Sequence, residues 1–497
     1  MTEPLTLYWG DIHNHNEIGY GRGSLERSYR LAQNTLDFYA FTPHGWWPDM
    51  PEQDEALCKA HREAFERVQE HWPEVIAQAN AANRDGTFVS YIGYEWHSLN
   101  WGDYHIIFPD SFGQLFHAPD LASLLKFARE NGALAIPHHS AYKQGWRGTK
   151  WAEHDEQISP VCEIYSEHGN SFETPSYWGM YAHSMGGSNR SQTVIEQLKI
   201  GRIIGFTAGT DNHFGYPGSY AEGLTGVWAS QLTRQAIFDA LRRRHSYAIT
   251  GDRIKIWFAL GTGIMGDVLP ASVSREIRLE IEALDEIDYV ELNKNGYALA
   301  RWWGDRSNIT GSTQHLLRLE WGWDALSSVH LTTWEIQGEL QGGRLMRMIP
   351  CLAGGGASTD RVNLMHVLDA THFIVESYTS RMNPLPTNSV VLEVEASQEC
   401  QLALVIFGQH PKGGAFRVSC DVVLNQLRDN NVSLSVFDSF LAPKVRIGPV
   451  IEKDKVSLVS EFVDPNPGDK DFYFIKVVQK NGHLAWSSPI WCNENRN

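Results

Sequence analysis

The first 215 or so residues repeat one pattern of hydrophobic and polar positions. A short apolar run ends in polar residues of the kind that bind metals, and a helix-like or irregular segment usually separates it from the next run. The runs are Leu5–His15, Leu36–His44, Phe88–Glu95, Ala133–His139, Val161–His168 and Ile203–His213. The helix-like segments are Ser24–Asn34, Glu52–Asn83, Ala118–Asn131 and Arg190–Lys199. This alternation predicts a parallel α/β fold, in which the chemistry lies at the carboxyl ends of the strands.

The pattern changes near residue 253. The segment Ser230–Asp252 predicts a helix that closes a first domain. After it come short runs with alternating polarity, separated by Gly, Asn, Pro and Asp, which predict antiparallel β-structure in a sandwich or an open sheet. We therefore expect two domains, residues 1–252 and residues 253–497.

Composition narrows the classes of partner. The formal charge of −17 argues against a nucleic-acid-binding surface and against docking on anionic membranes. The six cysteines contain no CxxC motif, which is typical of reduced thiols in a cytoplasmic protein. The first residues resemble no signal peptide, and no stretch approaches the roughly 18 apolar residues of a membrane-spanning helix. The expected partner is a small molecule, and homo-oligomer formation is left open.

Histidines and carboxylates at the ends of the runs predict a metal centre. His13 and His15 are two residues apart, so both side chains of an extended chain point to one side, and Asp211 and His213 repeat this spacing. The nine candidates are His13, His15, His44, Glu95, His105, His138, His168, Asp211 and His213. Because nine exceeds the four ligands of a tetrahedral zinc ion, we expect two or three ions that share a carboxylate, for which Glu95 is the natural bridge. Imidazole and carboxylate without thiolate suit zinc, manganese or iron(II).

Short motifs around these positions resemble a known family. They are His13-x-His15, Thr42-Pro43-His44, Gly93-Tyr94-Glu95, a Pro-His pair ending at His138, and Asp211-x-His213. Together they resemble the PHP (polymerase and histidinol phosphatase) superfamily of metal-dependent hydrolases. Longer phrases such as GYEWHS, IPHHSA and GTDNHFGYPGS are similar to a long bacterial subgroup whose organisation resembles that of the carbaryl hydrolases. The resemblance implies a distorted (β/α)7 TIM-like barrel, followed here by the β-rich domain.

The resemblance also implies how the ligands are shared among three ions. It assigns His13, His15 and Asp211 to one ion, Glu95 as a bridge to a second ion held by His105 and His138, and His44 and His213 to a third. Two departures from the family pattern concern the third ion. Pro43 stands where the family usually has Asp, and Gly21 and Arg22 stand where a further histidine is usual. We expect the third position to be the weakest, unless Glu17 substitutes for the missing ligand.

The candidate catalytic residues are His168, His139 and Glu95. Either histidine could act as the general acid that protonates the leaving group. A plain hydrogen-bonding role is an equal alternative for His139. The role of Glu95 is that of the bridging ligand.

Aromatic and basic residues beside the ligands are candidates for substrate binding. Trp46 and Trp96 could line a pocket for an apolar or aromatic leaving group, although core packing explains some of the 18 tryptophans. Arg22 and Arg147 could hold an anionic group, the alternative being solvated loop charge. The first functional hypothesis is hydrolysis of a phosphoester, mono- or diester, by a metal-bound hydroxide. The alternative is hydrolysis of a carbamate, carboxylic ester or amide, and a third reading is a non-catalytic glycan- or metal-binding protein.

Overall fold

The computed structural model describes residues 4–176, 178–180, 187–304, 312–324, 331–356, 358–428, 430–439 and 442–493. The chain forms two compact units. The first contains Met1–Ile281, Asp288–Trp303 and Val459–Asn497, and the second contains Glu282–Ile287 and Gly304–Leu458. Strands that follow residue 252 are therefore shared between the two units.

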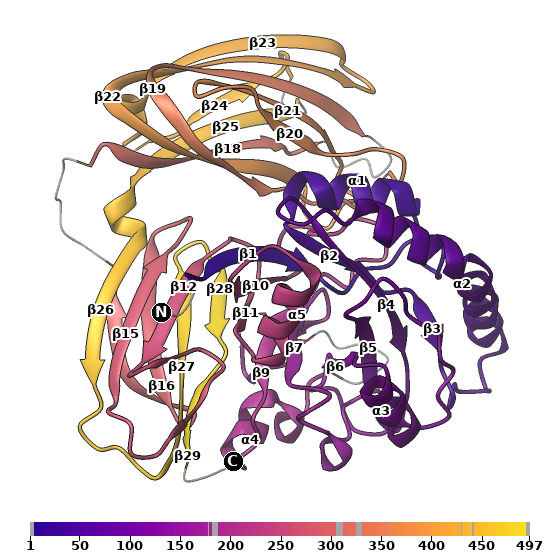
Figure 1. Cartoon of the computed structure of the whole chain (residues 1–497). Coiled ribbons are helices and arrows are strands. Elements are labelled where there is room, and N and C mark those ends of the chain that lie inside the picture. The colour runs from indigo at the N-terminus through magenta and orange to yellow at the C-terminus, as the bar shows by residue number, and fades with distance from the viewer. Residues whose placement is uncertain are drawn as a thin grey trace. The chain divides into compact units, whose positions relative to one another are not determined.

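A large mixed sheet is the centre of the first unit (Figure 1). Its strands from the first part of the chain are β1 (Thr6–Asp11), β2 (Phe38–Phe41), β3 (His44–Trp46), β4 (Val89–Trp96), β5 (Asp103–Phe108), β6 (Leu134–His138), β10 (Leu224–Ala229) and β11 (Ser246–Ile249). They lie in the order β11-β10-β1-β2-β4-β5-β6, and β3 pairs with β4. The pairs β1–β2 and β2–β4 are parallel, whereas β1–β10, β4–β5 and β5–β6 are antiparallel. Residues 97–102, a loop too short for a parallel crossover, join β4 to β5.

A second, smaller sheet carries two of the predicted runs. It contains β7 (Val161–Ser166), β8 (Gly169–Asn170) and β9 (Gly205–Ala208), with β7 parallel to β9. Among the described residues no pairing of named strands joins the two sheets into one closed barrel, so the expected (β/α)7 barrel is not shown. What the structure shows is a mixed α/β architecture with extensive sheets.

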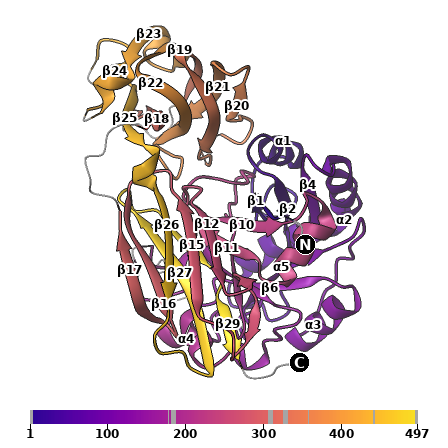
Figure 2. The ribbon, with the colours of Figure 1, turned by 60° about the vertical axis from the view of Figure 1, so that its left-hand side comes forward.

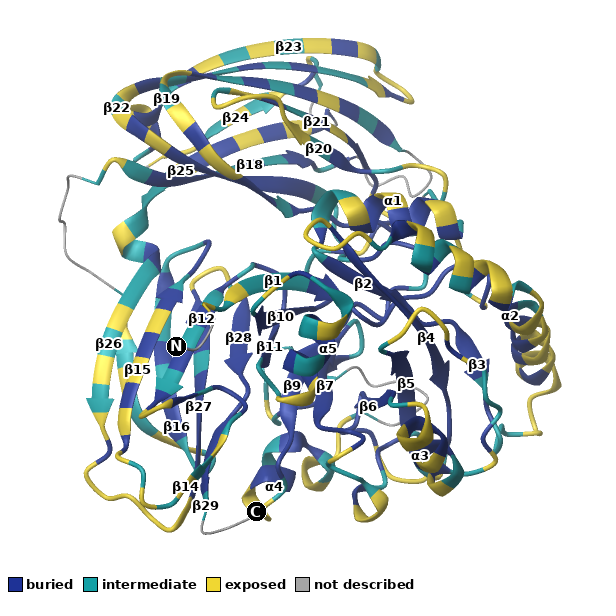
Figure 3. Ribbon diagram, in the orientation of Figure 1, coloured by how far each residue is buried: buried dark blue, intermediate teal, exposed yellow. Residues whose placement is uncertain are grey.

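Helices cover the strands of this part of the chain. They are α1 (Leu25–Thr35), α2 (Glu55–Ala82), α3 (Leu121–Glu130), α4 (Val194–Lys199) and α5 (Arg234–Arg242), with short 3-10 helices η1 (Trp151–Glu153) and η2 (Arg190–Gln192). Ser24 caps α1 by accepting a hydrogen bond from the backbone of Arg27, as its position predicts. The helix expected over 230–252 is only α5, because the apolar residues of Ser246–Ile249 form the buried strand β11 instead. Figure 3 shows the helices with one exposed face and the central strands buried.

The last part of the chain completes the first unit. Further strands of the large sheet are β14 (Val268–Pro270), β16 (Ile287–Lys294), β17 (Tyr297–Trp303), β27 (Lys470–Gln479), β28 (Leu484–Ser487) and β29 (Ile490–Asn493). Strand β28 pairs antiparallel with β11, Ala248 opposite Trp486. A four-stranded sheet contains β12 (Lys255–Leu260), β13 (Gly263–Ile264), β15 (Glu276–Glu282) and β26 (Ser457–Val463).

The second unit is built on one eight-stranded sheet. Its strands are β18 (Gln314–Gly322), β19 (Thr332–Cys351), β20 (Leu364–Val367), β21 (His372–Thr379), β22 (Thr387–His410), β23 (Gly414–Val423), β24 (Val432–Ser435) and β25 (Lys444–Glu452), with 3-10 helices η3 (Leu424–Leu427) and η4 (Lys453–Val456). All the pairings within it are antiparallel, and Figure 2 shows the long curved strands β19 and β22. Its core includes Trp321, Leu392 and Ile406. The antiparallel prediction for this region is confirmed. In the part of the chain that the structure describes, no helix has the length and apolarity needed to cross a membrane.

Candidate metal centre

The eight expected metal ligands come together in the first unit. His44, Glu95, His105 and His138 lie on β3, β4, β5 and β6, and the other four follow β1 or β9. Seven of the eight are at most 3% exposed, and the side chain of His213 is 24% exposed. Strand ends that meet at one edge place residues from six separate segments of the chain in a single cluster.

Glu95 lies at the centre of this cluster, and different histidines face its two carboxylate oxygens. Its Oε2 lies 3.6, 3.3 and 3.4 Å from the Nε2 atoms of His13, His15 and His44. Its Oε1 lies 2.9 Å from Nε2 of His138. A carboxylate with ligand-type groups facing both oxygens has the arrangement of a bridge between two ions, which is what the sequence predicts for Glu95.

The first group of possible ligands consists of His13, His15, Glu95 and Asp211. One ligand atom from each lies within 4.8 Å of the others. Asp211 Oδ1 lies 2.9 Å from Nε2 of His15 and 3.4 Å from Nε2 of His13. This is the set expected for the first ion, with Glu95 added.

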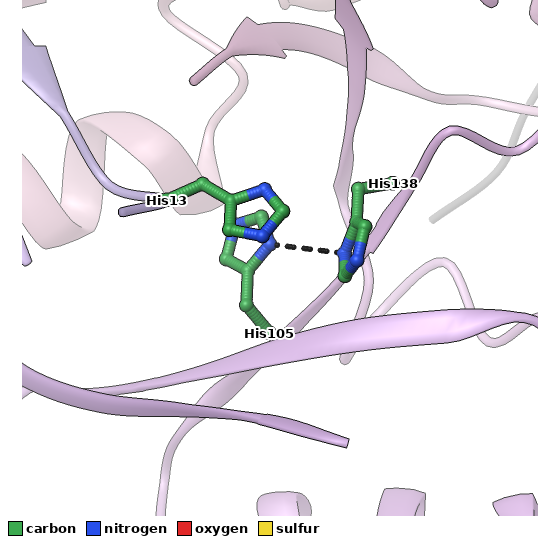
Figure 4. A group of neighbouring side chains, drawn as sticks. All are labelled: His13, His105 and His138. Atoms are coloured by element: carbon green, nitrogen blue, oxygen red, sulfur yellow. Dashed lines mark hydrogen bonds between the residues drawn. The ribbon is translucent and has the colours of Figure 1, made fainter. Parts of the chain in front are cut away.

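His13, His105 and His138 form the second group (Figure 4). Nδ1 of His105 and Nδ1 of His138 lie 3.3 Å apart. Two imidazole nitrogens at this distance, with Nε2 of His105 buried and without a hydrogen bond, suit a shared cation. His13 takes part in both groups, whereas the family resemblance implied a place in the first alone.

The third group consists of His15, His44 and His213. Nε2 of His213 lies 3.4 Å from Nε2 of His44, and the rings of His15 and His44 stack at 3.9 Å between centroids. His15 joins the two histidines that the family resemblance implied for this position. Glu17, which was expected as a possible substitute ligand, is exposed.

Gly21, which stands where the resemblance predicts a histidine, is closely packed beside this group. A Cβ at Gly21 would lie 2.9 Å from the carbonyl oxygen of Asn16 and 3.0 Å from that of His213. Backbone carbonyls cannot move aside as a flexible side chain can, so a side chain has no room at this position.

The ionisation states of His15, His44, His105 and Glu95 are those that metal ions require. His13 differs, because burial alone would lower its pKa but Asp211 and Glu163 raise it well above the usual value. Burial lowers the pKa of His15 to about 3, with a contribution from His213, and burial also lowers the pKa of His44 and of His105 well below the usual value. Burial alone would raise the pKa of Glu95, but the surrounding histidines lower it well below its usual value. Neutral imidazoles beside ionised carboxylates are the forms that bind divalent cations.

Several atoms of this cluster that could bind a metal ion are buried and have no hydrogen-bond partner. They are Nε2 of His13, Nδ1 of His15, Oε2 of Glu95 and Nε2 of His105. A buried polar atom without a partner costs about 1–3 kcal/mol, more when it is charged. A divalent cation would satisfy Nε2 of His13 and Oε2 of Glu95 at once, so the residues fit a metal ion.

Glu163 orients His13 from behind. Its two carboxylate oxygens lie 3.1 and 3.0 Å from Nδ1 of His13, which leaves Nε2 facing Glu95 and Asp211. Gly209 allows this contact, because a Cβ there would lie 2.5 Å from Oε2 of Glu163. A carboxylate on the outer nitrogen of a ligating histidine fixes its tautomer and raises its basicity. The only sequence signal for this role is the place of Glu163 within the run Val161–His168.

Replacement of Glu163 by glutamine is expected to weaken metal binding by about 10- to 100-fold, the usual cost of losing such a partner. The measurement is competition with a metal-sensitive dye at constant pH. Glu196→Gln, an acidic residue on α4 that pairs with Lys199, is the matched control. Unchanged affinity in Glu163→Gln would show that Glu163 does not tune the centre.

A second buried carboxylate, Asp103, organises the edge of the cluster. Asp103 is fully buried and forms an ion pair with Arg147. It also lies 3.4 Å from Nδ1 of His97 and 3.2 Å from Nε2 of His139. The spacing Asp103-x-His105 repeats the i, i+2 pattern of His13 and His15, and this was the signal that could have identified Asp103.

The two general-acid candidates differ in their surroundings. His139 is 2% exposed, and burial lowers its pKa well below the usual value. The side chain of His168 is 13% exposed, with Nε2 3.2 Å from Asp211 and Nδ1 2.8 Å from the hydroxyl of Tyr142. Burial alone would lower the pKa of His168, but Asp211 and Glu167 raise it. His168 is thus the histidine placed to hold a proton near the solvent side.

The expected substrate-binding residues occupy different environments. Arg147 donates to Nδ1 of His97 at 2.6 Å and lies 3.8 Å from Glu95. Trp46 stacks on His117 at 4.4 Å. Trp96 is fully buried, and its indole N–H donates to the carbonyl of Ala118, so it packs in the core and not among the ligands. Arg22 is exposed, and its backbone N–H donates to the carbonyl of His213.

Part of this chain matches a described protein family, and the chain is similar to proteins from two bacteria. Residues 166–276 match the family described as "Protein of unknown function (DUF3604)". An uncharacterized protein of Chlamydia pneumoniae is 25% identical over 328 residues, and one of Chlamydia muridarum is 25% identical over 335 residues. Each alignment covers 61% of this chain and 50% of the relative, so the chain spans about half the length of the curated relatives it matches.

A solved structure with some similarity to this chain is that of a two-domain protein from Bacteroides vulgatus ATCC 8482, which contains a predicted PHP-like metal-dependent phosphoesterase. It is 12% identical to this chain, and the TM-score is 0.30. The alignment covers 84% of this chain and 96% of the other.

Proposed function

We propose that this chain is a metal-dependent hydrolase of small phosphoesters, mono- or diesters, and that residues 1–252 carry the activity on a PHP-type arrangement of strands. One observation carries the proposal. Glu95 is buried between two groups of histidines, with His138 at one carboxylate oxygen and His13, His15 and His44 at the other. A structural ion would need only one such group.

The ligand groups would hold two or three divalent ions. His13, His15, Glu95 and Asp211 would hold one, His105 and His138 with Glu95 a second, and His44 and His213 with His15 a third. When bound, such ions neutralise the charge of a phosphoryl group and lower the pKa of water, which zinc, manganese or iron(II) can do.

Residues of the chain supply the remaining functions. Arg147 is held by Asp103 beside Glu95, where its guanidinium can attract an anionic ester. Asp211 and Glu167 favour the protonated form of His168, so its proton is available for a leaving group that departs toward solvent. His139 lies deeper, against Asp103, in a position that suits hydrogen bonding within the cluster.

Activity against a panel of esters tests this proposal. The purified protein with added manganese or zinc is assayed with an aryl phosphate, an aryl phosphodiester and an aryl methylcarbamate of the same phenol. We expect turnover of a phosphate ester and little or none of the carbamate. Turnover of the carbamate alone would establish the alternative reading, a carbamate, ester or amide hydrolase. Inactivity on every ester, with one tightly held ion per chain, would favour a structural metal site.

A further inference from the structure

Tyr20 places an aromatic ring over the candidate metal centre. The ring stacks on His44 with centroids 3.9 Å apart and planes 17° from parallel, and its centroid lies 5.3 Å from that of His213. Tyr20 is 38% exposed, whereas His44 is 1% exposed. Tyr20 therefore forms part of the solvent-facing side of the third ligand group.

Hydrogen bonds hold the loop that carries Tyr20. The guanidinium of Arg67 on α2 donates to the carbonyl of Gly19 at 2.6 Å, and the backbone N–H of Arg22 donates to the carbonyl of His213 at 2.8 Å. Gly21 is packed against backbone on two sides. With both neighbours of Tyr20 fixed in this way, the ring has a set position and needs no ordering when a ligand arrives.

Two buried aromatic side chains and one cation lie next to Tyr20. The ring of His61 meets that of Tyr20 edge to face at 4.7 Å, and Trp47 meets His61 at 5.1 Å. The guanidinium of Arg147 lies 5.4 Å from the ring centre of Trp47. We call Tyr20, His61 and Trp47 the aromatic wall. Arg147 also contacts Glu95 and His97, which form a further possible ligand group with His44. A cation and this wall therefore border the same group of ligands.

We propose that Tyr20 is a specificity-determining residue that favours substrates with a flat aromatic group attached to the phosphoryl centre. This inference rests on the proposed function. An exposed ring held parallel to a ligating histidine offers its outer face for stacking, and aromatic pairs prefer such geometry. The metal ions and Arg147 would hold the anionic group, and Tyr20 would contact the ring beside it. Trp46 and Trp96, which the sequence suggested for this purpose, would not be needed.

Binding of two phosphonates that the protein cannot hydrolyse tests the inference. Phenylphosphonate and methylphosphonate are titrated calorimetrically into the manganese-loaded protein. We expect the native protein to bind phenylphosphonate about 5- to 10-fold more tightly, in line with one aromatic contact. Tyr20→Ala should lose most of this preference, Tyr20→Phe should retain it, and Tyr20→Leu provides a second variant without an aromatic ring. Tyr297→Ala removes an exposed tyrosine on β17 and should change nothing.

Each outcome has a defined meaning when metal content is measured in every variant. Equal binding of the two phosphonates by the native protein overturns the inference and leaves the proposed function intact. Binding of neither phosphonate by metal-loaded protein counts against both. A preference for phenylphosphonate that persists in Tyr20→Ala and Tyr20→Leu, with metal content unchanged, overturns the role of Tyr20.

Discussion

Replacement of Glu95 by glutamine is expected to reduce hydrolysis by more than about 100-fold and to lower the number of bound divalent ions, since loss of an outer partner alone costs about 10- to 100-fold. The physical reason is the position of Glu95 between two ligand groups. Glutamine has nearly the same shape, but it offers one oxygen and no charge. One of the two sides of the centre would then face an amide nitrogen, which cannot coordinate a cation.

The measurement combines metal analysis by mass spectrometry with steady-state kinetics on the ester that the native protein turns over. Glu153→Gln is the matched control, because Glu153 is an exposed glutamate in η1 that pairs with Lys150. Full metal content and full activity in Glu95→Gln would contradict the bridging role. A loss of activity with unchanged metal content would mean that Glu95 acts on the substrate and not as a bridge.

Removal of metal ions by a chelator is expected to abolish hydrolysis and to lower the melting temperature. Glu95, Glu163 and Asp211 are buried together, and among the described residues Arg147 is the one permanently charged cation in ion-pair contact with any of them. Without divalent ions their repulsion is opposed by Arg147 and by His13 and His168, whose pKa values the carboxylates raise. Ions present at a thousandfold excess over Kd stabilise a protein by about 4 kcal/mol, which corresponds to a shift on the order of 5 °C for a unit of this size.

Differential scanning calorimetry with and without chelator measures this shift. Added manganese or zinc should restore both the melting temperature and the activity. In Glu95→Gln the chelator should have a smaller effect, because that variant has fewer ions to lose. An unchanged melting temperature, together with unchanged activity in chelator, would show that the cluster does not depend on metal ions.

Most of the ligand residues could be predicted because they lie at the ends of apolar runs, whereas His105 lies within β5 and in none of the six runs. The pairs His13/His15 and Asp211/His213 carry their own geometric signal, since i, i+2 positions of an extended chain share one side. Six such run ends then identify the cluster without knowledge of how the strands pair. Helix α1 was predictable for a similar reason, as Ser24 marks its beginning in the sequence.

The directions of the strands, and the contacts that hold the ligands from outside the cluster, could not be predicted in the same way. The antiparallel pairing of β4 with β5 depends on how residues 97–102 turn, which an apolar pattern does not specify. Strand β11 was included in an expected helix because its apolar residues Tyr247, Ala248 and Ile249 follow α5 closely. Glu163 touches His13 across 150 residues of sequence, and such a contact leaves no local pattern.

Strands β27, β28 and β29 give the end of the chain a part in the sheet that begins near its start. Strand β28 extends that sheet at β11, and the residues between the two strands include the whole second unit. During synthesis the ribosome therefore delivers all the metal ligands long before it delivers the strands that complete their sheet. While the second unit is being synthesised, the edge of β11 that later pairs with β28 has not yet received that partner strand. The metal ligands and the last strands of the sheet that supports them are therefore synthesised at well-separated times.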